Sequence, residues 1–357
     1  MHASPVTAQL PVHCVDLAKE KFQVHSFSHS GECLKRRTLN RAQFARLFSD
    51  PQRPRGLIVM EACASASYWC RRFEALGHRT RQLPAQFVAR HRLGSKNDGN
   101  DADAIHATHC DPRVRAVPAK SLAQQDLAAL HSARQLLVKQ RVQLSNQVRG
   151  LLAERGCVAG KGERGFHELL SRAAARDEAD VTEPLLAVIG LQLEVLRLLE
   201  VQLRGLDHQV AQLARQLPQA QLLTSIFGVG PLIATAFVAE HGAGVARYAD
   251  ARQFAASLGL TPREHSSGNT RRLGGITKWG DAYRRRLLIQ GASSVVQHCQ
   301  RHQDPLSDLA RRLLERHKCR NVVTTAVANR LARIIYAVLK HGEAYRLSPP
   351  ARLARTT

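Results

Sequence analysis

Two short apolar runs near the start of the chain each end in a carboxylic acid. The run from Val12 to Val15 is followed by Asp16, and the run from Leu57 to Met60 is followed by Glu61. Apolar runs of this length, rich in β-branched residues, predict strands. Two strands that each end in an acid indicate an α/β domain whose acids can converge on one site.

A second pair of acids lies at the start of a predicted helix. Asp98 and Asp101 are three residues apart and share one helix face, whereas Asp103 points roughly 200° away from Asp101. Carboxylates at two strand ends and on a nearby helix face can hold Mg²⁺ (or Mn²⁺), as in two-metal phosphoryl transfer. Taken singly, each acid is more often a turn or helix-cap residue than a ligand. Their joint placement favours the metal site.

The order of predicted elements supports this interpretation, because it is that of an RNase H-like fold. Three strands precede a helix, a fourth strand and another helix. The predicted ranges are 12–18, 21–27 and 33–39 for the strands, 41–48 for the helix, 57–61 for the next strand and 67–76 for the next helix.

The charge of the chain indicates a polyanionic partner. Its 357 residues include 52 Lys and Arg against 29 Asp and Glu, a net charge of +23. The basic residues cluster in loops and on mixed helices and do not form one amphipathic membrane helix, so we expect nucleic acid. The apolar runs look too short to span a bilayer and the N-terminus does not resemble a signal peptide, which predicts a cytoplasmic protein. The eight cysteines form no CxxC pair, so a structural zinc site is not expected.

The middle of the chain is predicted to be helical. One long helix covers residues 121–154, and leucines and other apolar residues recur at heptad spacing over 189–217. Two such helices can pack on each other as a hairpin or pair with another subunit as a coiled coil. The residues alone do not choose between these arrangements.

A glycine-rich turn follows between two predicted helices. In the stretch 222–234, Gly228 and Gly230 stand where a helix-hairpin-helix motif lets the backbone approach a DNA phosphate. A tight turn between packed helices explains the same residues equally well. The overall basic charge favours contact with the DNA backbone.

The loop 259–281 combines two serines with cationic side chains. Ser266 and Ser267 precede a glycine, beside His265. The surrounding cations are Arg263, Arg271, Arg272 and Lys278. A serine attacks a phosphate only when it is activated and cations neutralise the phosphoryl oxygens. The loop offers the cations but no certain base, so from these residues alone a phosphate-binding loop is the better interpretation.

The whole chain resembles an insertion-sequence transposase of the family numbered one hundred and ten, of the subgroup numbered eleven hundred and eleven. The resemblance rests on the acids with the Lys96–Ala102 segment, the helical middle, the Gly-x-Gly turn, the Gly259–Lys278 block and the closing Ala328–Tyr336 helix. It implies a RuvC-like domain over residues 10–120, a helical or coiled-coil spacer over 121–217 and a C-terminal transposase domain over 218–345. It also implies an element-encoded guide RNA.

Carried over residue by residue, the resemblance makes Asp16, Glu61, Asp98 and Asp101 the metal-binding tetrad. The family's nucleophilic serine precedes a glycine, which corresponds to Ser267; the doubled serine leaves Ser266 as the alternative. The chain departs from the family pattern at Phe227, where a proline usually precedes the turn.

The sequence thus predicts a magnesium-dependent recombinase that works on DNA through a phosphoserine, as a homodimer or homotetramer associated with the nucleoid. The alternative is a junction resolvase with the same acids and water as the nucleophile. A nucleic-acid-binding protein without catalysis is a third class.

Overall fold

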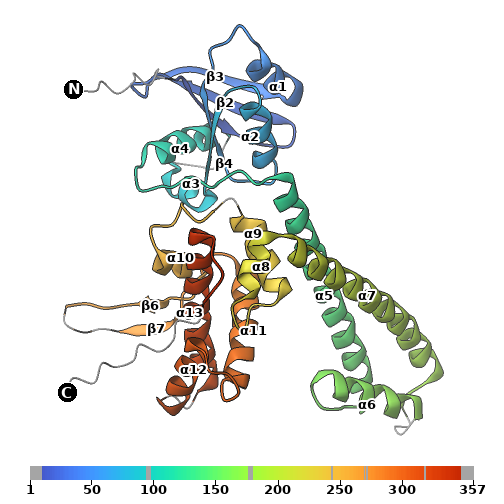
Figure 1. Cartoon of the computed structure of the whole chain (residues 1–357). Helices are drawn as coiled ribbons and strands as arrows, with labels where there is room; N and C mark the ends of the chain where they lie inside the picture. The colour runs from blue at the N-terminus through green and yellow to red at the C-terminus, as the bar shows by residue number, and fades with distance from the viewer. Residues whose placement is uncertain are drawn as a thin grey trace, which may run out of the picture. The chain divides into compact units, whose positions relative to one another are not determined.

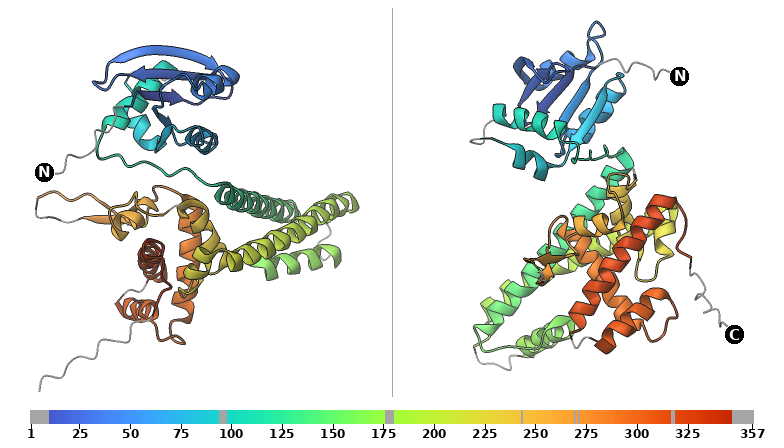
Figure 2. Two further views of the ribbon diagram at one scale, coloured as in Figure 1. Left: turned by 45° about the horizontal axis from the view of Figure 1, so that its top comes forward. Right: turned by 90° about the vertical axis from the view of Figure 1, so that its left-hand side faces the viewer.

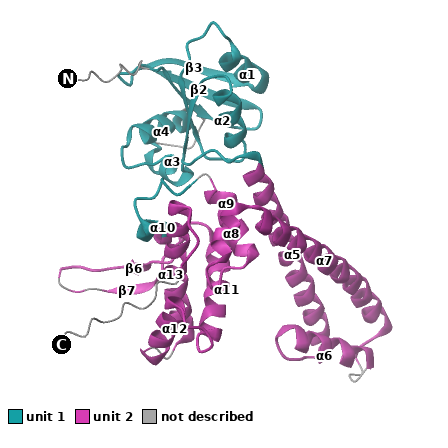
Figure 3. Cartoon of the chain, in the orientation of Figure 1, with its two compact units in different colours: residues 1–122, 243–254 teal, residues 123–242, 255–357 magenta. Residues whose placement is uncertain are grey.

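The structure is a computed structural model, which describes residues 10–93, 98–175, 180–242, 244–268, 270, 272–316 and 319–346, with 98 and 99 described through their backbone only. It divides into two compact units (Figure 3). One comprises residues 1–122 and 243–254, and the other comprises residues 123–242 and 255–357.

The first unit is built on a five-stranded sheet in the order β3-β2-β1-β4-β5 (Figure 1). The strands are β1 (Val12–Asp16), β2 (Lys21–Phe27), β3 (Cys33–Asn40), β4 (Leu57–Glu61) and β5 (Arg79–Leu83). Strand β2 is antiparallel to β1 and β3, whereas β4 is parallel to β1 and to β5. This mixed α/β arrangement is consistent with the expected RNase H-like domain.

Helices cover both faces of this sheet. On one face, α1 (Arg41–Ser49) and α2 (Ala66–Glu74) enclose a core that contains Val15, Met60 and Trp69. On the other, α3 (Ala85–His91) and α4 (Asp98–Cys110) cover a core with Cys14 and Val59. Alternate residues of a strand face opposite sides of a sheet, which explains why Cys14 and Val15 belong to different cores.

The second unit is helical apart from one β-hairpin (Figures 1 and 2). Its long helices are α5 (Leu122–Ala153) and α7 (Glu183–Gln216), and α6 (Gly162–Ala175) packs with both around Leu152, Leu169 and Ile189. The remaining elements are α8 (Pro218–Thr224), α9 (Pro231–His241), α10 (Ala251–Ser257, across the unit boundary), β6 (Pro262–Glu264), β7 (Leu273–Ile276), α11 (Ala282–His298), α12 (Pro305–Arg316) and α13 (Arg320–His341).

Helix α13 is long and apolar enough to cross a membrane by length and composition, contrary to the expectation from the sequence. Its apolar residues, among them Val327, Leu331 and Ile335, are buried, and the helix contacts α8, α11 and α12. This burial is that of a core helix.

Several elements were missed in the sequence, among them β5, α3 and α6, and the predicted loop 259–281 contains the β6–β7 hairpin. Strand β5 has the sequence RTRQL, which lacks apolar alternation, and α3 is short. Helix α6 lies in a stretch that is poorly patterned in the sequence, and its buried residues contact helices distant along the chain. Their stability comes from tertiary packing, which a local sequence pattern does not reveal.

Candidate functional site

Two of the predicted acids lie side by side on the sheet. The parallel register pairs Val12 with Leu57 and Val15 with Met60, so the next residues along, Asp16 and Glu61, are neighbours at the carboxyl ends of β1 and β4. By alternation both share the face of Cys14 and Val59, which is the face covered by α3 and α4. The structure therefore brings these two acids together, as predicted.

Helix α4 carries the third acid over that face. Asp101 is one helical turn before Ile105, which is buried in the core beneath α4. Asp101 is itself 8% exposed, and its carboxylate binds the Nε atom of Arg92. The side chain of Asp98 lies outside the described residues, although its backbone begins α4.

Asp103 faces elsewhere, as its place on the helix predicts. Its carboxylate lies 2.8 Å from Nδ1 of the buried His25 and 3.1 Å from the guanidinium of Arg36, on strands β2 and β3. It fastens α4 to the antiparallel part of the sheet.

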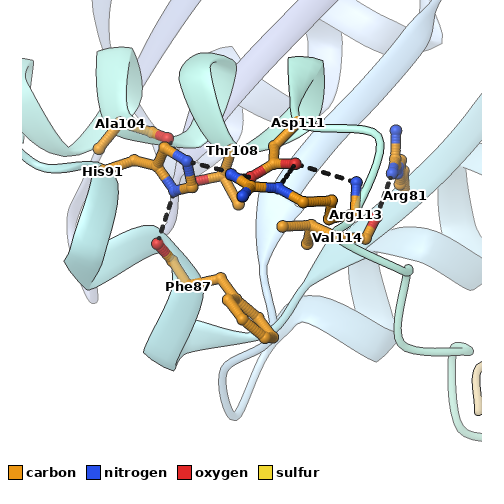
Figure 4. A network of polar contacts seen from close by, with 8 residues as sticks. All are labelled: Arg81, Phe87, His91, Ala104, Thr108, Asp111, Arg113 and Val114. Carbon is orange, nitrogen blue, oxygen red and sulfur yellow. Dashed lines mark hydrogen bonds and ion pairs between the residues drawn. The ribbon is translucent and has the colours of Figure 1, made fainter. Parts of the chain in front are cut away.

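The C-terminal end of α4 is held by a polar network (Figure 4). His91 binds the Phe87 carbonyl and approaches Asp111 at 3.5 Å, while Arg113 binds both carboxylate oxygens of Asp111 at 2.9 Å. The hydrogen bonds from Arg113 lower the pKa of Asp111 to about 2. Arg81 on β5 donates to the Val114 carbonyl at 2.8 Å. These contacts fix the helix that positions Asp101.

The acids have the donor chemistry that Mg²⁺ prefers, which is oxygen from carboxylates. Asp16 and Glu61 share one face, and the helix bearing Asp101 covers it. Among the described side chains, which exclude that of Asp98, no group of three or more His, Cys, Asp or Glu residues is arranged to hold a metal ion. The cation found at Asp101 is the Arg92 guanidinium.

The predicted serine lies at the turn of a hairpin in the second unit. Strands β6 and β7 pair Pro262 with Ile276 and Glu264 with Leu273. Beyond them Ser267 and Thr270 form a bridge through two backbone hydrogen bonds of 3.2 and 3.1 Å, and Gly268 takes φ 55° at the turn. A positive φ at a tight hairpin turn is where glycine is favoured.

The two adjacent serines differ in their side-chain contacts. Ser266 Oγ donates to Glu264 Oε1 at 2.8 Å and accepts the Arg272 backbone N–H at 3.2 Å. Ser267 is exposed, and among the described residues its hydroxyl has no side-chain hydrogen bond, its pairing with Thr270 being through the backbone. Glu264 was missed in the sequence; a signal for it was the two-residue spacing to Ser266, which puts both side chains on one side of an extended segment.

The predicted cations of this loop are exposed where the structure describes them. Arg263 lies on β6, Arg272 directly before β7, and Lys278 after β7 with φ 58°. Arg271 lies outside the described residues. The hairpin therefore presents positive charge on β6 and beside both ends of β7.

The Gly-x-Gly turn joins α8 to α9 as predicted, and its two glycines have different surroundings. A Cβ atom at Gly228, which has φ 87°, would lie 2.6 Å from Val295 and 2.9 Å from the Gly291 carbonyl of α11. At Gly230, the N-cap of α9, a Cβ atom would meet nothing within 4 Å. Close packing inside the protein thus explains Gly228, while Gly230 is exposed.

Comparison with known proteins places both regions in transposase families. Residues 14–155 match a DEDD transposase family of IS110 elements, described as "Transposase", and residues 220–306 match the "Transposase IS116/IS110/IS902 family". The first span includes Asp16, Glu61, Asp98 and Asp101, and the second includes Ser267.

Relatives that match over most of their length are also named as transposases. The chain is 42% identical over 340 residues to a "Probable family 20 transposase" of Pseudomonas aeruginosa, covering 93% of this chain and 97% of that protein. It is 34% identical over 332 residues to the transposase for insertion sequence element IS1111A of Coxiella burnetii, covering 93% and 90%. With the transposase for IS1328 of Yersinia enterocolitica the identity is 32% over 338 residues, covering 93% and 97%.

The family matches over both units and the similarity to these relatives thus identify a DNA transposase of an insertion sequence. The chain belongs to the IS116/IS110/IS902 transposase family. Transposases act on DNA, and domains of this DEDD family are usually metal-dependent.

Proposed function

We propose that this transposase cuts and rejoins DNA through a phosphoserine formed on Ser267. The observation that carries the proposal is the contrast in hydrogen bonding within the hairpin, where both serines are exposed. The Ser266 hydroxyl is engaged by Glu264 and by the Arg272 backbone, whereas the Ser267 hydroxyl has no side-chain hydrogen bond to the described residues. A hydroxyl that is not engaged in this way is available to attack a phosphate.

In the proposed reaction the Ser267 Oγ attacks a DNA phosphate. The Oγ–P bond forms while the P–O bond to the leaving deoxyribose breaks, the serine proton passes to solvent and the leaving oxygen takes up a proton. Arg263 and Arg272 neutralise the phosphoryl oxygens. After strand exchange, attack by a free hydroxyl end on the phosphoserine reverses these bond changes and reseals the DNA, so no external energy source is consumed.

Asp16, Glu61, Asp98 and Asp101 would hold Mg²⁺ (or Mn²⁺). When bound, the metal supplies Lewis-acid stabilisation of negative charge on phosphate oxygens. Support comes from the adjacency of Asp16 and Glu61 and from the placement of Asp101 on the helix over their face. The Arg92 guanidinium would leave Asp101 as the ion enters.

An exposed apolar stripe on α7 supports the proposed homodimer or homotetramer. Val188, Leu191, Val195 and Leu198 are all exposed at alternating spacings of three and four residues. Ile189, Leu196, Leu199 and Leu203 are buried within the chain. A helix with a second apolar stripe at heptad spacing can pair with a copy of itself. The hairpin and coiled-coil hypotheses are therefore compatible.

The remaining partners follow from the family resemblance and the charge. An element-encoded guide RNA would select sites, and the protein would act in the cytoplasm on the nucleoid. Gly230 at the N-terminus of α9 would approach the DNA backbone in a helix-hairpin-helix contact. Retention of a nuclease-protected RNA on the purified protein would support the guide, and purification free of nucleic acid would count against it.

A junction resolvase with water as the nucleophile is the second candidate. It uses the same acids, and their adjacency on the sheet supports it without requiring any role for the serine. It differs from the first candidate in forming no covalent link between protein and DNA.

The deciding experiment detects protein attached to DNA. Wild-type protein, Ser267→Ala and Ser266→Ala are each incubated with Mg²⁺ and DNA carrying the element's junction, then denatured. We expect adducts from wild type and Ser266→Ala but none from Ser267→Ala, with unfolding free energies within roughly 0.5 kcal/mol of wild type for the exposed Ser267. An adduct from Ser267→Ala but none from Ser266→Ala would move the nucleophile by one residue.

Two further variants separate metal from serine. Asp16→Asn should bind DNA but form no adduct. Cleavage without any adduct by the double serine variant would favour the resolvase. Recombination at wild-type level by Asp16→Asn would refute the role of the acids.

A further inference from the structure

One of the two tryptophans of the chain is on the surface, at the base of the serine hairpin. Trp279 is 58% exposed, whereas Trp69 is 1% exposed among the phenylalanines of the first unit's core. An aromatic side chain usually contributes to stability by burial, and Trp279 gains little in this way. The exposed part of the ring is a candidate surface for contact with a ligand.

The backbone around Trp279 is held tightly. A Cβ atom at Gly259 would lie 2.4 Å from the Trp279 carbonyl oxygen, and one at Gly280 would lie 1.9 Å from the Ser257 carbonyl oxygen. Arg285 donates to the carbonyls of Trp279 at 2.9 Å and of Leu258 at 3.1 Å. The segment thus fits only because glycines flank it, and it fixes the point from which the indole projects.

The residue before Trp279 has a strained backbone conformation, which also indicates that this segment is rigid. Lys278 has φ 58° and is the only residue other than glycine with a positive φ among those described. Its N–H donates to the Gly259 carbonyl at 3.2 Å, and the Thr277 N–H donates to the Thr261 carbonyl at 2.9 Å. A lysine in this conformation costs free energy that the surrounding contacts must offset. The result is a rigid support under an exposed aromatic ring.

The charge beside the ring indicates the kind of partner. Lys278 is the adjacent residue, and Arg263 and Arg272 are exposed on the same hairpin. An aromatic side chain next to a run of cations is the combination by which proteins bind unpaired nucleic acid, because a base stacks on the ring while the cations contact the backbone phosphates. Bases inside a duplex are already stacked on both faces and cannot use the ring in this way.

We propose that Trp279 is a stacking platform for an unpaired base of the DNA or RNA that the hairpin contacts. The inference rests on the proposed nucleic-acid function of the hairpin. It adds the class of substrate, which is a strand with unpaired bases at a junction, nick or displaced end. Trp279 is here a binding residue that positions the strand, and the serine chemistry does not require its ring.

Intrinsic fluorescence tests the stacking directly, because Trp69 is buried and should not respond. Oligothymidylate is titrated into the full-length protein and into Trp279→Phe, and the difference between them reports Trp279. We expect quenching of the Trp279 emission by the single strand, and little quenching by the corresponding blunt duplex. Equal quenching by both, or none, would overturn the proposal.

Affinity provides the second readout. Loss of one stacked base corresponds to roughly a 5- to 150-fold weaker affinity. We expect a loss in this range for oligothymidylate with Trp279→Ala, wild-type affinity or nearly so with Trp279→Phe, and an unchanged slope of log affinity against log salt for both. Leu273→Ala is the matched control, because Leu273 is 51% exposed on the same hairpin without an aromatic ring. Wild-type affinity of Trp279→Ala, or an equal loss with Leu273→Ala, would refute stacking.

The outcome is separable from that of the proposed serine chemistry. Ser267→Ala should bind oligothymidylate and show the same quenching although it forms no adduct. If adducts were absent from wild type as well, the quenching would still decide the role of Trp279.

Discussion

Arg92 binds Asp101 through an ion pair that joins the residue after α3 to the helix that carries the second pair of acids. Both side chains are largely buried, so water screens the pair less than a surface ion pair. The guanidinium and a metal ion would compete for the same carboxylate charge, because Arg92 already binds Oδ1 of Asp101.

Replacing Arg92 should therefore strengthen metal binding. We expect Arg92→Gln to raise the affinity for Mn²⁺ by roughly tenfold, equivalent to about 1.4 kcal/mol. Titration calorimetry or the electron spin resonance of free Mn²⁺ measures this change. Arg53→Gln is the control, since the exposed Arg53 pairs with Asp50 outside the network that holds α4. Weaker Mn²⁺ binding by Arg92→Gln would show that Arg92 supports the acids and does not compete for them.

The hydrogen bond from Ser266 to Glu264 predicts a structural role for this pair. In Glu264→Gln the amide oxygen can still accept from Ser266, so the rate of adduct formation should stay within a few-fold of wild type. Glu264→Ala removes the acceptor and should slow adduct formation by roughly tenfold, as expected when one hydrogen bond to a charged group is removed. Complete loss of adducts in Glu264→Gln would instead identify Glu264 as the base that takes the serine proton.

The cations of the hairpin should contribute to DNA binding through phosphate. On duplex DNA, Arg272→Gln should reduce the slope of log affinity against log salt by roughly 0.9, because one interaction with a phosphate is removed. Arg312→Gln, which removes an exposed charge from α12, should leave the slope unchanged. Identical slopes for Arg272→Gln and wild type would exclude a phosphate interaction at Arg272.

The two glycines of the turn should respond differently to alanine. Gly228→Ala forces a methyl group against Gly291 and Val295 at a positive φ, and should lower the free energy of unfolding by roughly 2–4 kcal/mol. Gly230→Ala has room for the methyl group and should unfold like wild type. Denaturant titration measures both. A loss of duplex binding by folded Gly230→Ala would support a close approach of the DNA backbone, and unchanged binding would argue against it.

Three histidines, one buried and two half-buried, should make the protein less stable in mild acid. Burial is the main cause that lowers the pKa of His13, His109 and His131 to about 4 from the ordinary 6.5. Their neutral forms are favoured in the folded state, so the unfolded chain binds more protons between these values. Stability should be full above pH 6.5 and fall as the pH drops towards 4.

Melting temperatures between pH 7 and 4.5 test this expectation. His131 connects α5 to α9 and α11 through Thr235 at 3.0 Å and Tyr283 at 2.9 Å. His131→Gln should reduce the change in melting temperature with pH, whereas replacing the exposed His29 should leave that change as it is in wild type. A melting temperature that is constant from pH 7 to 4.5 would contradict the lowered pKa values.

Elements whose residues repeat with a clear period could be predicted from the amino-acid sequence alone. The boundaries of β2 and β4 were predicted to the residue and those of α5 within one, because an apolar period is a local property of the chain. The motifs that place the chain in its transposase family are also local, since they are runs of neighbouring residues. The adjacency of Asp16 and Glu61 needed one further fact, the parallel pairing of β1 with β4.

The partner that each side chain meets emerged only from the folded chain. Arg92 reaches Asp101 because α3 and α4 pack against each other. A glycine is required at position 228 because Gly291, which is far along the chain, lies against it. Strand pairing and turn geometry distinguish Ser266 from Ser267, which are adjacent and chemically identical in the sequence. Such contacts depend on how distant segments pack, and no local pattern of residues specifies that packing.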